Sequence, residues 1–346
     1  MKILVTGGSG FIGTWLIRRL LNKWKDIVNF DLINFPERSS GINGIRGDVR
    51  DYKQVKTASR GMDIIFHLAA LPAITRAGKK IIEVNVRGTE NVLRAGIENK
   101  IKKVIYVSSS AVFGIPKKLP INKFTPINPI DIYGKSKAEA EMVCQNYRNK
   151  GLNVIIMRPC PVIGPERLGV FGILFDWIYN NRNIFIIGSG LNKLEFVHVS
   201  DFCNACILAL ERANNVTFEI GGGGFSTLKE DLASLIKHAQ KSSKIISLNK
   251  MFARITLFIL DFIRLSPLTR FHYLTYSEDF YCDDYAQEAL GYYPSYDNKK
   301  ALAESYDWYV SNLDKVKNIL SSAQKNFNQM ALRMLKYPMF TNRKYL

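Results

Sequence analysis

The chain has no long apolar segment, few cysteines and few acidic residues. None of its 346 residues falls in an uncharged apolar window of about 20, so no transmembrane helix is expected. We also expect no secretory signal, because the first strand-like run, KILVTG, begins at residue 2. Five cysteines are an odd number and do not suggest a disulfide framework, which favours a reducing cytoplasm. Cys203 and Cys206 form a C-x-x-C within a helix-like run, and no second ligand pair lies nearby, so we predict no metal site.

Acidic residues are scarce, because 30 Asp and Glu stand against 48 Lys and Arg, which gives a net charge of +18. This excess is compatible with an anionic substrate, a nucleic acid or a membrane surface, or with a lysine-rich surface that only contacts solvent. Residues 315–346 contain Lys and Arg but no acid, and this basic tail is either a docking segment or an appendage. No aromatic-interleaved basic motif of an RNA-binding module occurs, so we expect no nucleic-acid partner.

Apolar runs and helix-period segments alternate through the first half of the chain. Strands are expected at 2–7, 26–31, 42–48, 63–70, 102–110 and 152–159, and helices at 10–23, 51–60, 80–99 and 131–150. Later strands are expected at 184–188 and 193–199, and later helices at 173–181, 226–240 and 299–313. Strands that alternate with helices form βαβ units. We therefore predict an α/β fold: a Rossmann-type, doubly wound parallel sheet with a smaller, mainly C-terminal substrate-binding domain.

The run TGGSGFIG after the first strand has the spacing of a dinucleotide-binding turn. Gly7 permits the tight turn, Gly10 lets a pyrophosphate approach, and Gly13 lets helix and sheet pack closely. The helix N terminus that follows supplies free N–H groups for the phosphates. Asp31 ends the second strand, where a carboxylate binds the adenosine ribose and repels a 2′-phosphate. The sequence therefore predicts NAD in preference to NADP. The GGGG at 221–224 is interpreted as a flexible turn, because only a weak helix follows it.

In DIYGKSKAEA, residues 131–140, Tyr133 lies four residues before Lys137. The spacing puts both side chains on one helix face, where an ammonium can make the phenol proton more mobile. Taken alone, the pattern also fits an exposed aromatic beside a solvated lysine. Other motifs occur in order along the chain: Asp31, GDVRD (47–51), HLAA (67–70), NVRGT (85–89), VSSSAVFG (107–114), RPCPVIGP (158–165) and EFVHVSD (195–201). With the glycine turn and YGKSK, this series resembles the extended short-chain dehydrogenase/reductases, the NAD-dependent epimerase/dehydratase family, over about residues 1–220.

The resemblance implies that Tyr133 is the general acid/base and that Lys137 assists it and holds the nicotinamide ribose. Lys137 and the oxidised nicotinamide would lower the pKa of the Tyr133 phenol from its usual value near 10. Ser109 would bind the reacting oxygen, and Ser110 would do so if the register is off by one. The cofactor-binding residues implied are Gly7, Gly10, Phe11, Ile12, Gly13, Asp31, Asp48, Val49, Leu68, Ala69, Ala70, Tyr133, Lys137 and Pro159. The substrate-binding residues implied are Ser109 and Ser110. For His67 and His198, a structural hydrogen bond is the better interpretation.

The expected function is a cytoplasmic NAD-dependent epimerase, dehydratase or dehydrogenase that acts on a small anionic molecule, such as a nucleotide-activated sugar. The sequence departs from the family pattern at two positions: Phe113 replaces a tyrosine of Val-Tyr-Gly and so lacks its hydroxyl, and Pro161 replaces an asparagine that contacts the nucleotide diphosphate. Pro161 and the apolar segment 251–265 favour an alternative, a 3β-hydroxysteroid or dihydroflavonol type of dehydrogenase or reductase with a less polar substrate. A protein that binds NAD or RNA without catalysis is the third alternative. By resemblance, a homodimer is expected, formed through the helices within 79–99 and 131–150.

The predicted division of the chain has three parts. Residues 1–165, joined by about 183–224, form the NAD-binding domain, whereas 166–182 and 225–314 form the substrate-binding region and 315–346 the tail. Within the second part, MFARITLFILDFIRL (251–265) is apolar nearly all round, apart from Arg254, Asp261 and Arg264. It is too short and too charged to span a membrane. A core helix, a wall of the substrate pocket and a peripheral membrane contact are the three interpretations of this segment.

Asp31→Ala should relax the preference for NAD over NADP, because it removes the carboxylate that repels a 2′-phosphate. The ratio of the Michaelis constants for the two cofactors measures this preference. An unchanged ratio would count against the ribose contact.

Overall fold

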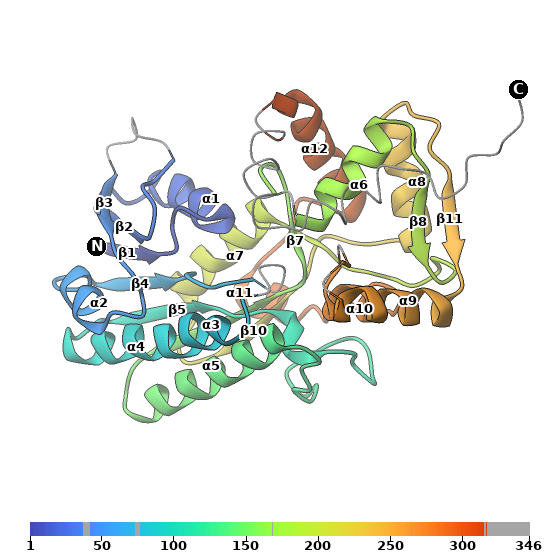
Figure 1. Cartoon of the computed structure of the whole chain (residues 1–346). Coiled ribbons are helices and arrows are strands. Elements are labelled where there is room, and N and C mark those ends of the chain that lie inside the picture. Colours follow the sequence, from blue (N-terminus) through green and yellow to red (C-terminus); the bar gives the residue numbers. More distant parts are fainter. Residues whose placement is uncertain are drawn as a thin grey trace, which may run out of the picture.

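Seven parallel strands form the central sheet of the protein (Figure 1). The structure is a computed structural model that describes residues 1–36, 42–72, 77–167, 169–263, 265–266, 268–314 and 316. In spatial order the strands are β10 (Thr217–Ile220), β6 (Val154–Pro159), β5 (Lys103–Val107), β4 (Ile64–His67), β1 (Ile3–Thr6), β2 (Ile27–Asp31) and β3 (Asn43–Arg46). All neighbouring pairs are parallel. The order reverses direction between β1 and β4, and this switch point is where α/β sheets bind ligands.

Helices cover both faces of this sheet, as a parallel sheet requires. On one face lie α1 (Phe11–Leu20), α7 (Val199–Arg212) and α11 (Tyr285–Leu290). On the other lie α2 (Tyr52–Ala58), α4 (Gly88–Glu98) and α5 (Ile132–Asn149) (Figure 1). A short helix, α3 (Lys79–Ile82), continues through a π-helical turn (Glu83–Arg87) into α4. The strands bury Ile, Leu, Val and Phe on both faces, and β1 is buried throughout.

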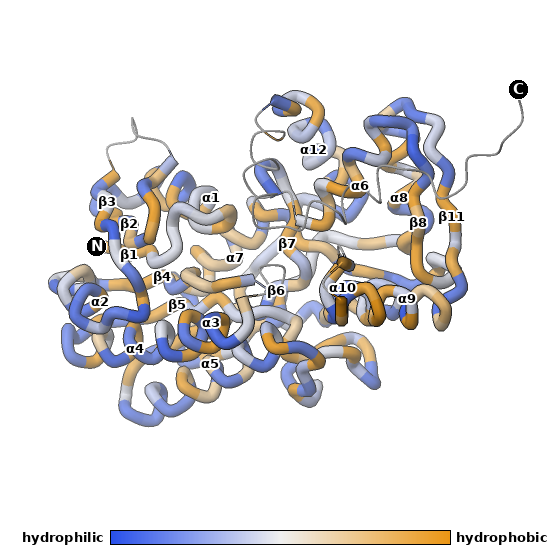
Figure 2. The backbone as a smooth tube through the Cα atoms, viewed as in Figure 1, coloured by the Kyte–Doolittle hydropathy of each residue, from blue (hydrophilic) through white to orange (hydrophobic). Residues whose placement is uncertain are grey.

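A second core lies beside the sheet. It is built on a two-stranded parallel sheet of β8 (Ile184–Ile187) and β11 (Ile245–Leu248). Its helices are α6 (Gly169–Tyr179), α8 (Leu228–His238), α9 (Lys250–Phe262), α10 (Arg270–Thr275) and α12 (Asn298–Ser311). Two short strands, β7 (Val162–Ile163) and β9 (Val197–His198), pair between the two cores. Figure 2 shows hydrophobic segments converging on the strands of both sheets.

The structure confirms the predicted fold class, with each strand and helix expected in the first 160 residues present. One expected strand differs, because 193–199 contains only the two residues of β9. Leu194 makes just an isolated bridge to Phe280, and Val199 already begins α7. The predicted domain boundaries remain a prediction. Except for Val316, the basic tail lies outside the described residues.

Close packing explains two of the glycines in the first turn. Gly7 has a φ of +73°, and a Cβ there would lie 2.5 Å from the backbone N of Ala69. A Cβ on Gly13 would lie 2.4 Å from the carbonyl oxygen of Gly7, so this residue sets how closely α1 approaches the turn. The expected flexible turn at 221–224 is instead partly buried: a Cβ on Gly222 would lie 2.1 Å from the carbonyl oxygen of Phe196. Its glycines serve close packing as well.

Cys203 and Cys206 are buried in α7 within the core, as expected for small helix-facing side chains. None of the helices in the described ranges is long and apolar enough to cross a bilayer. For the segment 251–265, the core-helix interpretation is wrong. Of the residues of α9, Ala253 is buried, whereas its large apolar side chains are mostly exposed.

Gly13→Ala should lower the free energy of unfolding by roughly 1–3 kcal/mol, because the new Cβ must displace backbone atoms. Gly96→Ala in α4 is the matched control, since its Cβ would meet the nearest side-chain atom, Leu152 Cδ2, at an ordinary 3.4 Å. The control should be neutral or stabilising by up to about 1 kcal/mol through its helix propensity. Urea denaturation measures both changes, and equal losses would refute this account of Gly13.

Candidate active site

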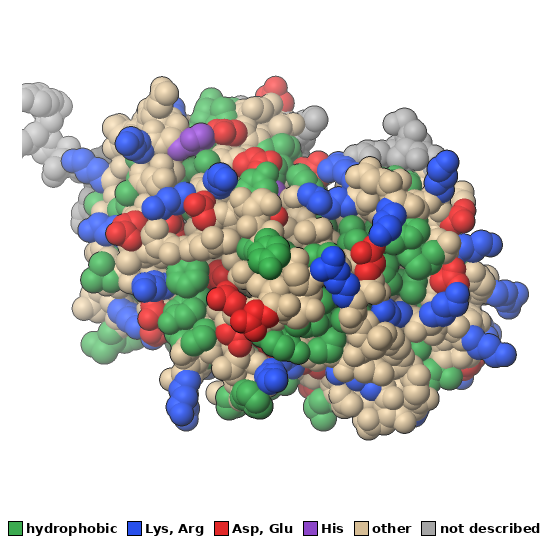
Figure 3. Space-filling model, turned by 180° about the vertical axis from the view of Figure 1, so that it is seen from behind, with side chains coloured by type: hydrophobic (Ala, Val, Ile, Leu, Met, Phe, Trp, Pro, Cys, Tyr) green, Lys and Arg blue, Asp and Glu red, His purple; other side chains and the backbone are tan. Residues whose placement is uncertain are grey.

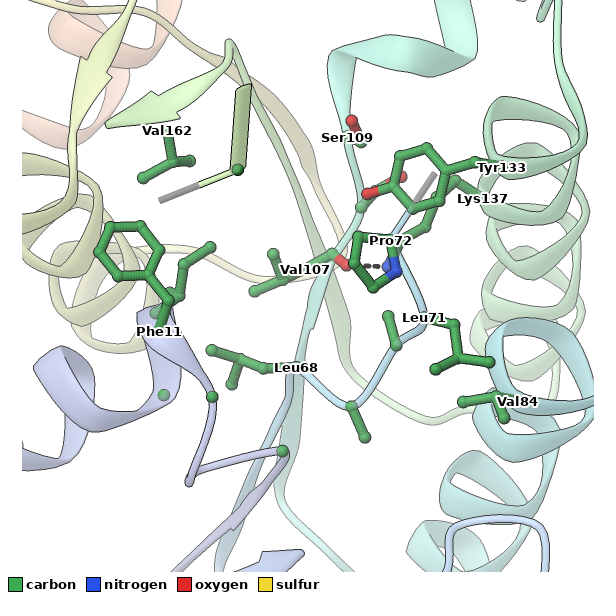
Figure 4. A pocket seen from close by; sticks show the side chains of 18 of the residues that line it. Phe11, Leu68, Leu71, Pro72, Val84, Val107, Ser109, Tyr133, Lys137 and Val162 are labelled. Atoms are coloured by element: carbon green, nitrogen blue, oxygen red, sulfur yellow. Dashed lines mark hydrogen bonds between the residues drawn. The ribbon is translucent and has the colours of Figure 1, made fainter. Parts of the chain in front are cut away.

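A cavity of about 610 Å³ opens at the carboxyl ends of β1, β4 and β5. Every residue that the sequence assigned to cofactor, substrate or catalysis lines this one cavity. The glycine turn and Asp31 stand on one side of the sheet's switch point, and the start of α5 stands across from them (Figure 4). The cavity therefore joins a dinucleotide-type turn to a tyrosine and a lysine.

At the end of the cavity near β2, two carboxylates are held by local hydrogen bonds. Asp31 Oδ2 accepts a hydrogen bond from the backbone N of Ser9 at 3.0 Å, so its side chain lies against the glycine turn. Asp48 pairs with Arg50 at 2.6 Å, and this hydrogen bond holds the pKa of the Asp48 carboxyl below its usual value. Both carboxylates are thus fixed along the wall where the sequence places an adenosine.

Tyr133 and Lys137 point into the cavity from the first turns of α5, and Ser109 faces them from the end of β5 (Figure 4). The carboxylate of Asp131 caps α5 by accepting a hydrogen bond from Gly134 N at 2.7 Å. A Cβ on Gly134 would lie 2.6 Å from the Ala111 carbonyl oxygen, so this glycine brings the two segments close together. As a result, the Ser109 hydroxyl hydrogen-bonds the Tyr133 phenol.

The pKa of the Tyr133 phenol is raised, chiefly by burial, while Ser109 and the charge of Arg167 oppose the rise. Lys137 Nζ donates a hydrogen bond to the carbonyl oxygen of Val107 at 2.7 Å, and burial lowers the pKa of this lysine to about 8. The sequence predicts that Lys137 and a bound oxidised nicotinamide together lower the pKa of Tyr133. The protein's own groups raise this pKa, because burial outweighs Ser109 and Arg167, and the joint effect with NAD stays a prediction.

Sequence reasoning missed a buried ion-pair network next to Lys137 on α5. Arg158 pairs with Glu141 at 2.5 Å and with Glu219 at 2.8 Å, and the Ser108 hydroxyl hydrogen-bonds Glu141. Glu141 lies one turn beyond Lys137 on α5, a spacing that could have revealed it. Glu219 is brought in by β10, which no local pattern indicates.

Arg167 is a second residue that the sequence did not single out. It lines the cavity and its guanidinium carbon lies 5.5 Å from the centre of the Phe11 ring. Its backbone N–H donates to the carbonyl oxygen of Gly164 at 3.1 Å, whereas its guanidinium makes neither an ion pair nor a hydrogen bond with the described residues. Burial lowers its pKa, and the nearby Tyr276 and Tyr133 phenols oppose this. Its only sequence signal is a position just after the Gly-Pro of RPCPVIGP. Arg167 therefore offers the cavity a cation that has no carboxylate partner among the described residues.

A buried cluster of Cys160, Glu195 and Cys282 lies at the back of the site. The two sulfur atoms are 3.3 Å apart, although the cysteines are 122 residues apart in sequence. The Glu195 carboxylate accepts hydrogen bonds from the backbone N of Cys282 and of Gly222, each at 2.8 Å. Burial raises the pKa of Glu195 to about 7. Because N–H donors already occupy both oxygens, we interpret the cluster as a structural link between β6 and the segment before α11.

Both histidines have the structural roles that the sequence favours. His67 bonds the Thr6 and Thr89 hydroxyls at 2.6 and 2.9 Å, and burial lowers its pKa to about 3. His198 caps α7 and stacks on Tyr296. Of the two departures from the family pattern, Phe113 is buried with Arg158 over its ring, whereas Pro161 lines the cavity.

Comparison with known proteins agrees with this geometry. The sequence pattern of the NAD dependent epimerase/dehydratase family matches residues 3–221. An uncharacterized protein of Sinorhizobium fredii, y4nG, is 37% identical over 312 residues, which make up 89% of this chain and 78% of that protein. A putative UDP-glucose 4-epimerase of Methanocaldococcus jannaschii is 31% identical over 251 residues, 68% of this chain and 81% of that protein.

One solved structure is similar both in fold and in sequence. DesIV, a dTDP-glucose 4,6-dehydratase of Streptomyces venezuelae solved with NAD and TYD, superposes with a TM-score of 0.74. It is 26% identical, and the superposition covers 90% of this chain and 98% of that one. The matched residues 3–221 contain both the glycine turn and the first turn of α5.

Proposed function

This chain belongs to the NAD-dependent epimerase/dehydratase family, and we propose that it moves hydride between NAD and a secondary alcohol or ketone of a nucleotide-activated sugar. The observation that carries the proposal is that Tyr133, Lys137 and Ser109 share one cavity with the glycine turn. Tyr133 is the general acid/base in this proposal. Lys137 and Ser109 orient the reacting groups.

The residues around the turn fit NAD, which supplies the hydride acceptor when bound. A Cβ on Gly10 would meet only the Gly7 carbonyl oxygen, at 3.3 Å, so the space above this residue is open. Gly10 also precedes α1 without a side-chain cap, which leaves the helix N–H groups for phosphate oxygens. Asp31 would accept hydrogen bonds from the ribose hydroxyls.

The raised pKa of Tyr133 decides how its proton is used. Because burial dominates, the phenol is protonated at neutral pH and is ready to donate a proton to a substrate oxygen. In the opposite direction the phenol must give up its proton before it can act as a base. The positive charge of Arg167 and the Ser109 hydrogen bond favour that phenolate. The Lys137 ammonium, held by the Val107 carbonyl, would hold the nicotinamide ribose.

Arg167 and the related proteins support a nucleotide sugar as the substrate. An arginine without a protein counter-ion inside a cavity suits a diphosphate, which it can bind with two parallel hydrogen bonds. The Methanocaldococcus relative and DesIV are described as acting on UDP-glucose and dTDP-glucose. Pro161 in the lining, in place of the family's asparagine, favours the second candidate, a dehydrogenase or reductase with a less polar substrate.

A protein that only binds RNA is less well supported. Figure 3 shows Lys and Arg spread over the rear face with Asp and Glu among them, without one continuous basic strip on that face. The chain also keeps Ser109, Tyr133 and Lys137 together at the cavity. Homodimer formation through α4 and α5 remains a prediction.

Tyr133→Phe should reduce kcat by about 100-fold or more, the usual contribution of a general acid/base, and leave NAD binding near normal. Turnover of UDP-glucose and dTDP-glucose, with NAD binding measured by fluorescence, checks both effects. Tyr276→Phe is the matched control, because Tyr276 lines the same cavity without contacting Ser109 in the described structure. Parallel loss of turnover and NAD binding in Tyr133→Phe would mean a folding defect or another base.

Arg167→Gln should raise KM for a sugar nucleotide by about tenfold or more, since a charge-assisted hydrogen bond contributes roughly 1.5–3 kcal/mol. Arg167→Lys keeps the charge and should recover part of the loss. Steady-state kinetics with the diphosphate substrate measures the two constants. A KM equal to that of the native enzyme would exclude Arg167 as a diphosphate ligand.

A further inference from the structure

Helix α9 presents an unbroken apolar face to the outside. Six of its large side chains are between 53% and 82% exposed, and they are Met251, Phe252, Ile255, Phe258, Ile259 and Phe262. Their spacing of three and four residues places them on one side of the helix. We call this set the α9 stripe. Scattered exposed apolar residues are ordinary, but a continuous stripe marks an interaction site.

The polar side of α9 faces the protein. Arg254 donates hydrogen bonds to the Leu274 carbonyl oxygen and to Glu278, each at 2.6 Å, and to the Ser277 hydroxyl at 2.8 Å. Lys250 also pairs with Glu278, at 2.8 Å. These bonds fix the rotation of the helix, so the α9 stripe cannot turn inward without breaking a partly buried ion pair. The outward orientation of the α9 stripe is therefore fixed by the fold.

A loop distant in sequence adds to the same side of the molecule. Residues 115–130, here the lysine loop, contain exposed Lys117, Lys118 and Lys123 and no acidic residue. Phe124 in this loop is 81% exposed, and Ile127 is also exposed. In the view of Figure 1 the lysine loop lies below α10, and Figure 2 shows α9 as strongly hydrophobic.

Helix α10 connects these two features to the cavity. It packs on α9, and the charge of Arg270 at its start acts on Asp131 at the end of the lysine loop. Phe271 and His272 of the same helix line the cavity. The α9 stripe and the lysine loop thus both adjoin α10, the helix that lines one side of the cavity.

We propose that the α9 stripe and the lysine loop dock this protein on an anionic lipid surface. Apolar side chains would enter the boundary between headgroups and acyl chains, while the lysines would meet the headgroup phosphates. The charge of the chain is complementary to such a surface: it is +18 overall, and part of this excess comes from residues 315–346, which contain Lys and Arg but no acid.

Charge and chemistry separate this partner from the others. A second copy of the chain would bring the same lysines to the contact and so would repel rather than complement them. A nucleic acid would supply negative charge but no apolar phase for six large side chains. Of these three partners, a lipid surface offers both negative charge and an apolar phase.

Co-sedimentation of the full chain with vesicles tests the proposal. The protein should pellet with vesicles of phosphatidylcholine and phosphatidylglycerol, and much less with phosphatidylcholine alone or at high salt. Phe258→Ser with Phe262→Ser keeps the net charge and should weaken binding by about tenfold or more. Tyr293→Ser removes a 77% exposed aromatic elsewhere and should bind as the native chain does.

Three results would overturn the proposal. In the first, the chain pellets with neither kind of vesicle, and in the second, the double variant binds as strongly as the native chain. In the third, light scattering without lipid would show that the native chain is a dimer and the double variant a monomer. That result would identify the α9 stripe as a contact between copies of the chain. None of these readouts depends on catalysis, so the proposed function is tested separately.

Discussion

Arg158 is the buried charge on which the arrangement of the site depends. Its guanidinium pairs with a carboxylate of α5 and with another of β10, and all three side chains are almost fully withdrawn from water. Removing one member of such a group leaves an uncompensated buried charge, which costs about 3–5 kcal/mol. Glu141 follows Lys137 by one turn, and Arg158 directly precedes Pro159. The network therefore holds α5 against β6, whose last residue, Pro159, lines the cavity.

The same exclusion of water that surrounds this network sets the chemistry of the cavity. Groups that lose water favour their neutral forms, and this is why the pKa of Tyr133 rises while that of Lys137 falls to about 8. A positive charge that enters such a site strongly changes the pKa values of its neighbours, because little water screens the interaction. Arg167 is one such charge, and a bound oxidised nicotinamide is another. The proton affinity of the phenol is therefore coupled to occupancy of the cavity.

Local patterns in the sequence predict the sheet, its helices and the lining of the cavity. Gly7, Gly13 and Tyr133 lie in motifs whose spacing follows from one strand, one turn or one helix face. The remainder depends on contacts between distant segments. Glu219 reaches Arg158 from another strand, and Cys282 reaches Cys160 across the second core. Nothing in 251–265 alone tells which side of that helix faces outward, because Arg254 finds its partner Glu278 only in the folded chain.

The edge strand β10 lies far along the sequence from its partner in the main sheet. Strand β10 pairs with β6, so that Thr217 lies beside Ile156, and α6 and β8 come between them in sequence. This intervening stretch connects two paired strands, and the entropy cost of bringing its two ends together grows only slowly with its length. The stretch also contains β7, β9 and α7, and α7 packs on the main sheet, whereas α6 and β8 belong to the second core. Insertions within α6 or β8 therefore lie away from the pairing of β10 with β6. Such an arrangement lets evolution vary part of the second core while it keeps one inherited nucleotide-binding frame.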